Sequence, residues 1–250
     1  MLEHTFVHIP GVGPKSEQML WEKGITTWQH FLEEKEDVFS PGKDGMIRGF
    51  LLKSIEHRRD IRFFQDLLPR GETWRLFKAF QQRSVYLDIE TDGGHEGVHE
   101  ITVIGIYNGK TVQTFINGKN LQEFECVIAD YDLVITFNGS LFDLPFIRRF
   151  FPGISLPAGH IDLRFVLAKL GYKGGLKHVE QRLGICRSSE IDGLNGYDAV
   201  LLWRAYEWGD AASLNRLIRY NTADIMNLEP LMEMAYETLK ERLLKGRETV

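Results

Sequence analysis

The segment Val85–Gly94, with the sequence VYLDIETDGG, constrains the fold of this chain more than any other stretch. Its short, β-branched apolar run predicts a buried β-strand, and side chains alternate between the two faces of a strand. Asp88 and Glu90 therefore lie on the same face, with only Ile89 between them. Two neighbouring carboxylates on a buried strand repel each other and lose their hydration. Something elsewhere in the folded chain must offset this cost.

The composition is that of an ordinary globular protein. The chain has 250 residues, 43% of them hydrophobic, which is enough for one large domain or for a large and a small one. A net charge of −5, from 30 basic and 35 acidic residues, excludes a strongly basic coat for nucleic acid but not local basic patches. Cys126 and Cys186 form no C-x-x-C motif, and we find neither a signal peptide nor a run of ~20 apolar residues. We therefore expect a soluble cytoplasmic protein with free thiols and no membrane contact.

The hydrophobic pattern divides the chain into two parts. Up to about Phe80 the pattern is helical, and from Ser84 short β-branched runs are followed by helical segments. Strands are expected at 84–90, 101–107, 111–116 and 133–137, and helices at 121–129, 142–150, 163–170, 176–183, 199–208 and 211 to about 244. This order predicts an α/β fold in which helices flank a mixed sheet, with a small all-α N-terminal domain. We expect the domains at residues 1–78 and 79–250, with a hinge at the sequence PRGETW near Arg70.

Two further carboxylates stand in apolar surroundings. Asp143 follows the strand at 133–137 and its turn, and Asp224 lies in a helical pattern one turn after Tyr220. Asp143 also has a simpler explanation, because an acid in the first turn of a helix stabilises the helix dipole. If the fold gathers all four acids, divalent cations resolve their repulsion, and oxygen-only ligands suit Mg²⁺ or Mn²⁺. Two such ions stabilise the attacking and leaving oxygens of a phosphoryl displacement.

The order of these motifs is similar to that of a known enzyme family. The chain carries D-x-E on the first strand, then N-x-x-x-F-D ending at Asp143, then Y-x-x-x-D ending at Asp224. This set resembles the DEDD 3′–5′ exonucleases, which have an RNase H-like fold. Tyr220 places the resemblance in the tyrosine subclass, since Arg219 stands where the histidine subclass has its histidine. The resemblance covers residues 85–232 and is strongest to the RNase H-like exonucleases of bacteria and archaea.

The resemblance implies an enzymatic function and its residues. It implies that Asp88, Glu90, Asp143 and Asp224 bind two divalent cations, Mg²⁺ or Mn²⁺, and that Tyr220 orients the attacking water. The reaction is then hydrolysis of phosphodiester bonds from a 3′ end to nucleoside monophosphates, with single-stranded DNA as the favoured substrate and RNA as the alternative. Two competing interpretations are a non-catalytic nucleic-acid-binding protein with the same fold and four unrelated acids at surface or capping positions.

Residues near the motifs are candidate substrate contacts, namely Thr91, Asn138, Phe142, Lys173 and Lys177. The aromatic ring is suited to stack on a base and the lysines to hold the backbone of a strand. Each has a structural alternative: a strand end, a turn former, a core aromatic, and a solvated turn between helices. Asp162 is expected to be a helix N-cap, and His95, His99 and His160 are expected to be surface or turn residues.

The N-terminus carries a separate signal. The segment HIPGVGPKSEQMLWEKG resembles a helix-hairpin-helix element, whose turn falls on Ile9, Gly11, Val12 and Gly13. The glycines allow the backbone to approach a phosphate, with Lys15 and the start of the next helix nearby. Too few residues precede this turn for a full first helix, so packing or protein binding is the alternative role.

Overall fold

The structure is a computed structural model that describes residues 1–94 and 100–245, so His95 and His99 lie outside the described residues. The chain forms two compact units, Met1–Gln81 with Tyr236–Val250, and Gln82–Ala235. The domain boundaries drawn from the sequence, at residues 78 and 79, stay a prediction. The segment expected to be a hinge is instead a 3-10 helix, η2 (Arg70–Leu76), within the first unit, because its Trp74 and Leu76 are buried there.

The first unit is helical in its described residues before η3, and side-chain caps define several of its helices. It contains η1 (Leu2–His4), α1 (Pro14–Glu22), α2 (Trp28–Glu33), α3 (Pro41–Glu56), α4 (Ile61–Leu67), η2, α5 (Phe77–Phe80) and the end of α11 (Ala211–Lys245) from Tyr236 onward, with η3 (Gln81–Arg83) at its border. Thr27 and Ser40 each accept a backbone N–H at a helix start. The buried carboxylate of Glu17 binds the buried Arg75 guanidinium at 2.8 Å and so ties α1 to η2.

The second unit is built on a five-stranded mixed sheet with the strand order β3-β2-β1-β4-β5. The strands are β1 (Ser84–Thr91), β2 (Ile101–Tyr107), β3 (Val112–Ile116), β4 (Leu133–Thr136) and β5 (Gly159–Asp162). β1 pairs antiparallel with β2 and parallel with β4. This confirms the predicted α/β class. The short β5 was not predicted, because four residues give too little alternation to separate a strand from a loop.

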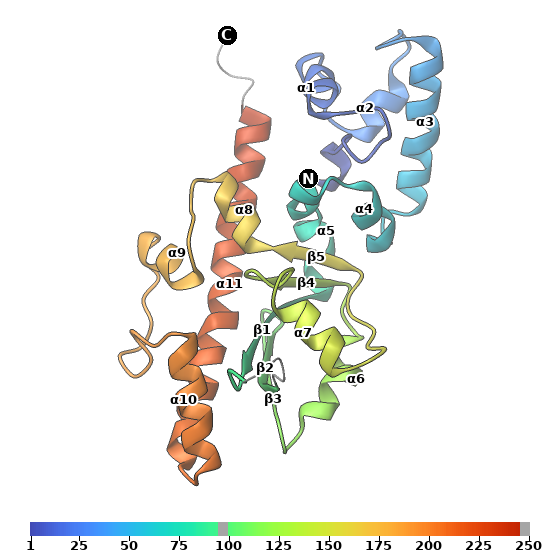
Figure 1. Cartoon of the computed structure of the whole chain (residues 1–250). Helices are drawn as coiled ribbons and strands as arrows, with labels where there is room; N and C mark the ends of the chain where they lie inside the picture. The colour runs from blue at the N-terminus through green and yellow to red at the C-terminus, as the bar shows by residue number, and fades with distance from the viewer. Residues whose placement is uncertain (95–99, 246–250) are drawn as a thin grey trace. The chain divides into compact units, whose positions relative to one another are not determined.

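Helices cover both faces of this sheet. They are η4 (Leu121–Glu123), α6 (Phe124–Ile128), α7 (Asp143–Phe150), α8 (Leu163–Lys169), α9 (Leu176–Arg182), α10 (Gly196–Glu207) and α11 (Ala211–Lys245). α6 and α7 pack on the face formed by Val85, Leu87 and Ile89. α10 and the first half of α11 pack around Val103 on the other face, and Figure 1 shows these two helices side by side. Among residues 1–94 and 100–245, no helix has both the length and the apolar character needed to cross a membrane.

Candidate metal and catalytic site

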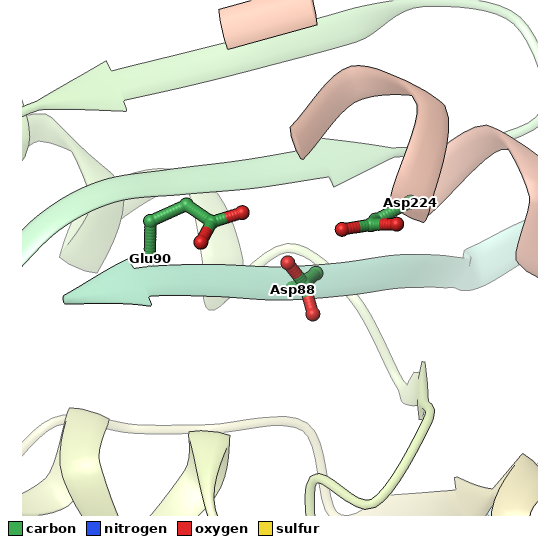
Figure 2. A group of neighbouring side chains, drawn as sticks. All are labelled: Asp88, Glu90 and Asp224. Atoms are coloured by element: carbon green, nitrogen blue, oxygen red, sulfur yellow. The ribbon is translucent and has the colours of Figure 1, made fainter. Parts of the chain in front are cut away.

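Three carboxylates from two elements meet above β1. Asp88 and Glu90 lie on β1 and Asp224 lies on α11, and one oxygen from each falls within 4.8 Å of the other two. Figure 2 shows the three side chains directed toward a common point. The packing of α11 on the sheet thus brings Asp224 to Glu90 and Asp88, which precede it by 134 and 136 residues in the sequence. A group of three oxygen ligands at this spacing can hold a divalent cation.

The alternation of β1 produces this arrangement. Val85, Leu87 and Ile89 enter the hydrophobic core beneath α6 and α7. The residues between them point to the opposite face, where α11 runs. Asp88 and Glu90 therefore share the α11 side, as the sequence predicts. The register of β1 between β2 and β4 fixes both carboxylates, since a slip of one residue would move them into the apolar core.

Burial makes these acids poor anions in the protein alone. Loss of hydration, reinforced by neighbouring carboxylates, raises the pKa of Asp88 and of Glu90 well above their ordinary values. Burial raises the pKa of Asp224 to about 6, against the opposing effect of Arg187. A bound cation would therefore stabilise the charged form of each carboxylate.

Asn221 holds the centre of the cluster in place. Its Nδ2 donates to Asp88 Oδ2 at 3.0 Å and contacts the Asp88 backbone oxygen at 3.3 Å. The amide reaches this position because Gly105 pairs with Asp88 across the strands, and a Cβ at Gly105 would lie 1.9 Å from Asn221 Oδ1. A polar residue on the apolar face of α11, three residues before Asp224, was a signal that the sequence interpretation did not use.

Asp143 lies beside this group rather than in it. Its Oδ1 accepts the backbone N–H of Ile89 at 3.1 Å, which places it against β1. Burial raises the pKa of Asp143 to about 7, and its charge in turn raises the pKa of Asp88. The structure therefore brings all four predicted acids into one electrostatic environment, with Asp143 outside the set of three convergent oxygens.

A buried arginine that the sequence interpretation missed contacts Asp224. The Arg187 side chain is 4% exposed, and its Nη2 bonds to Asp224 Oδ1. Its Nε and Nη2 also bind both oxygens of Glu180 at 2.7 Å, and Asn227 donates to the same carboxylate. This chain of contacts orients Asp224. No sequence pattern points to Arg187, because it lies in an irregular segment 37 residues before its partner.

Tyr220 and Lys177 form the next layer of the site. Lys177 Nζ donates to the Tyr220 hydroxyl at 2.5 Å and to the backbone oxygen of Leu194. Burial and the surrounding carboxylates raise the pKa of Tyr220, so the phenol stays protonated. Because the lysine donates to the hydroxyl oxygen, the tyrosine proton is left to donate to another group. Lys177 is thus tied to Tyr220, whereas Lys173 is exposed in the loop between α8 and α9.

The carboxylates line an open cavity of about 330 Å³. Thr91, at the end of β1, and Phe142, just before α7, also line it, together with Gly196 at the start of α10. Phe142 is 40% exposed, so the interpretation of this residue as a core aromatic is wrong. Its ring lies 4.8 Å from that of Phe146, which supports it from the side of α7.

The turn before Asp143 is held by the next strand. Asn138 has a φ of 70°, and its Oδ1 accepts from Arg164 at 2.5 Å. Asp162 caps α8, as predicted, and also accepts the backbone N–H groups of Asn138 and Ser140. Asn138 is therefore a fixed turn residue. His160, expected to be a surface or turn residue, is half-buried on β5: its Nε2 lies 2.9 Å from Thr136 Oγ1, and loss of hydration lowers its pKa to about 4.

The donor set fits divalent cations. Among the described residues, Glu90 Oε1 is buried without a hydrogen-bond partner. In the part of the chain that the structure describes, two cationic side chains, Lys177 and Arg187, lie among these carboxylates. They are fewer than the acids of the site, which are Asp88, Glu90, Asp143, Asp224 and Glu180. Such a surplus of buried oxygen ligands without histidine or cysteine suits Mg²⁺ or Mn²⁺.

Known proteins resemble this chain in sequence profile and in fold. The sequence profile of the RNase_H superfamily matches residues 85–236, and no curated protein matches the chain significantly. Solved structures that align with it include the family B DNA polymerase from the archaeon Pyrobaculum calidifontis, at 16% identity and a TM-score of 0.49, over 60% of this chain and 24% of that one. Escherichia coli RNase D, an exoribonuclease involved in structured RNA processing, aligns at 17% identity and a TM-score of 0.43 over 71% of this chain and 49% of its own. Brucella melitensis NrnC bound to pGG aligns at 21% identity and a TM-score of 0.45 over 68% and 78%. The chain thus spans about a quarter of the polymerase and about half of RNase D.

Proposed function

The chain belongs to the RNase_H superfamily, and on that premise we propose that it is a metal-dependent 3′–5′ exonuclease that hydrolyses nucleic acid to nucleoside monophosphates. The observation that carries the proposal is that carboxylate oxygens of Asp88, Glu90 and Asp224 lie within 4.8 Å of one another at the wall of the open cavity. Carboxylates with raised pKa values at a cavity wall mark a functional site rather than a solvated surface. The 3′–5′ polarity rests on the resemblance of the motifs.

Asp88, Glu90, Asp143 and Asp224 would hold two divalent cations. Bound there, Mg²⁺ or Mn²⁺ supplies charge stabilisation for the attacking and leaving oxygens of the phosphodiester. The protein's own part is orientation. Asn221 fixes Asp88 by a hydrogen bond at 3.0 Å, and the Ile89 N–H fixes Asp143 at 3.1 Å. The contact from Arg187 does the same for Asp224.

Tyr220 positions the attacking water. Its hydroxyl accepts from Lys177, so its own proton is available to donate to a lone pair of water. The raised pKa of the Tyr220 phenol makes it a donor and not a base. A fixed donor restricts the direction of attack, and an error in such positioning costs as much as ~10²-fold in rate.

The substrate enters beside Thr91 and Phe142. Both residues line the cavity, and the exposed Phe142 ring is suited to stack on the terminal base. Lys173 in its exposed loop is suited to contact the backbone of the strand, while Asn138 shapes the turn that carries Phe142. We propose a single strand as the substrate, because a ring that stacks on a base requires an unpaired base. Single-stranded DNA stays the favoured substrate and RNA the alternative, distinguished by its 2′-hydroxyl.

The N-terminal hairpin is a second proposed contact with nucleic acid. Gly11 has a φ of 77°, as a tight turn requires, and Gly13 is the N-cap of α1. The backbone conformation at position 13 does not require a glycine, and a Cβ at this position would meet nothing within 4 Å. Close approach of a phosphate to the backbone, next to the exposed Lys15, explains the absence of a side chain at Gly13. Such binding would not depend on base sequence.

The proposed activity is tested by digestion of labelled oligonucleotides. Single- and double-stranded DNA and RNA are incubated with the full chain and Mg²⁺ or Mn²⁺, with Asp88→Asn as the control. Release of nucleoside monophosphates from the 3′ end by the wild type alone supports the proposal. A wild-type protein that binds strands and metal without cleaving them would instead be a non-catalytic binding protein.

A further inference from the structure

Helix α10 has apolar residues on two opposite faces. On one face Ala199 and Trp203 are buried against Leu217 and Tyr220 of α11. This face explains why α10 lies beside the first half of α11 (Figure 1). A helix that is apolar on both sides is normally covered on both sides. The second face of α10 therefore calls for a partner.

The second face carries a row of exposed side chains, the α10 stripe, made of Tyr197, Leu201, Arg204 and Trp208. Tyr197 is 65% exposed, Leu201 44% and Trp208 92%. At 3.6 residues per turn these four positions fall within an arc of roughly 60° along ~17 Å of helix. Scattered single apolar residues are normal on a protein surface, but a continuous row with two large aromatic rings indicates a binding surface.

The charge of the stripe favours an anionic partner. The Arg204 guanidinium makes no hydrogen bond or ion pair with any residue that the structure describes. Asp198, the acid nearest to Tyr197, is engaged in capping, since its Oδ2 accepts the Asn195 N–H at 2.8 Å. The stripe thus presents one unpaired cation between two aromatic rings. Flat rings stack on bases and a free guanidinium binds a phosphate or a base face.

The stripe begins at the catalytic cavity. Gly196, the first residue of α10, lines the cavity together with Asp88 and Tyr220. The capping box of Asn195 fixes this end of the helix, because Asn195 Oδ1 accepts the Tyr197 N–H at 2.8 Å. Tyr197 directly follows the cavity-lining Gly196, and Trp208 is the C-cap at the other end of α10. A strand leaving the cavity along α10 would meet these rings in succession.

We propose that the α10 stripe binds the unpaired strand upstream of the nucleotide that occupies the catalytic cavity. The inference rests on the proposed exonuclease function and names its substrate class, a single strand of several nucleotides. At the ~3.4 Å spacing of stacked nucleotides, the ~17 Å of the stripe matches on the order of five of them. Binding through stacking tolerates any base sequence.

The test measures binding separately from cleavage. In the Asp88→Asn background, the dissociation constant is measured by fluorescence anisotropy for a single strand of about twelve nucleotides and for a dinucleotide. Trp208→Ala is expected to weaken binding of the long strand roughly tenfold and Arg204→Gln to reduce its salt dependence by about one phosphate. Neither change should affect the dinucleotide, which is too short to reach Trp208. Leu52→Ala, which removes a 60% exposed apolar side chain in the first unit, is the matched control.

The results of this test distinguish the possible partners of the α10 stripe. Unchanged affinity for the long strand, or equal losses for the long strand and the dinucleotide, overturns the proposal. If the wild type is a dimer and Trp208→Ala is a monomer with unchanged affinity for the strand, the stripe binds a second copy of the chain. That result also overturns the proposal. If the unmodified chain cleaves no substrate while the stripe variants still lose affinity, the exonuclease function fails and the stripe stands as a strand-binding surface.

Discussion

The Asn221 side chain occupies the space in which a side chain at position 105 would stand. A Cβ on Gly105 would lie 1.9 Å from Asn221 Oδ1, and Asn221 Nδ2 in turn holds Asp88 at 3.0 Å. The absence of one methyl group on β2 thus permits the hydrogen bond that orients a proposed metal ligand on β1.

Gly105→Ala is expected to displace the Asn221 amide, because the added Cβ would lie only 1.9 Å from Asn221 Oδ1. We expect a loss of stability of about 1–3 kcal/mol, as for other overpacked cores, with a large fall in hydrolysis. Thermal unfolding and turnover are measured for Gly105→Ala, Asn221→Ala and the double variant. Most of the stability cost of the added methyl should disappear in the Asn221→Ala background. Additive effects in the double variant would show that the two residues are not coupled.

Asp88→Asn is expected to abolish hydrolysis while preserving the fold. It removes a proposed metal ligand that contacts Asn221, but it also removes a carboxyl group whose charged form is destabilised by burial and by Asp143 and Asp224. The metal-free variant should therefore unfold at the same temperature as the wild type or higher, and added Mg²⁺ should stabilise it less. A variant with full activity would remove the basis of the two-metal interpretation.

Tyr220→Phe separates the hydroxyl from the ring. The ring remains packed in its cluster, so stability should change little, whereas turnover should fall by ~10²-fold with little change in KM. Asp224→Asn should be more severe because it alters a proposed metal ligand. Lys177→Met is the companion variant, since it removes the donor to the Tyr220 hydroxyl and leaves the phenol in place. Unchanged turnover in Tyr220→Phe would exclude the proposed role of the tyrosine.

The stability of the metal-free protein should depend on pH through Asp143. Burial raises the pKa of Asp143 from 3.8 to about 7, so between these values the folded protein binds a proton that the unfolded chain releases. Folding is therefore favoured at the acid end of this window and loses that contribution as the pH rises through about 7. The melting temperature of Asp143→Asn minus that of the wild type should therefore increase by at least ~2–4 °C from about pH 5 to about pH 8.

This comparison also contains its own control. Burial lowers the pKa values of His8 and His160 to about 4, so both affect stability in acid, but they are present in both proteins and cancel in the difference. Addition of Mg²⁺ at about pH 8 should recover the stability lost by the wild type. Parallel melting curves for the two proteins across this range would contradict the assignment of Asp143 to the acidic cluster.

The sequence predicted those parts of the fold that depend on local pattern. The alternation in Val85–Thr91 placed two carboxylates on one face and apolar residues on the other, as the structure has them. The long helix 211–244 followed from its periodicity, and α11 has almost these bounds. Strand β5 has four residues and no clear alternation, so it could be recognised only by its pairing with β4.

The parts that were missed depend on contacts between distant segments. Arg187 and Glu180 stand in unremarkable sequence, and only the packing of α9 and its following loop against α11 brings them to Asp224. The sequence left two interpretations of Phe142 open, a ring that stacks on a base and a core aromatic, and the structure leaves this ring exposed at the cavity. Exposure of a single aromatic residue is decided by tertiary packing, which periodicity over two turns does not determine.

The most direct test of the central claim is a time course on a strand labelled at its 5′ end, with matched assays of the wild type and Asp88→Asn in Mg²⁺, in Mn²⁺ and in chelator. We predict that the wild type shortens the labelled strand one nucleotide at a time only when metal is present, that nucleoside monophosphates accumulate, and that Asp88→Asn leaves the strand intact. Equal shortening by Asp88→Asn, shortening in chelator, or an intact strand with the wild type in either metal would contradict it.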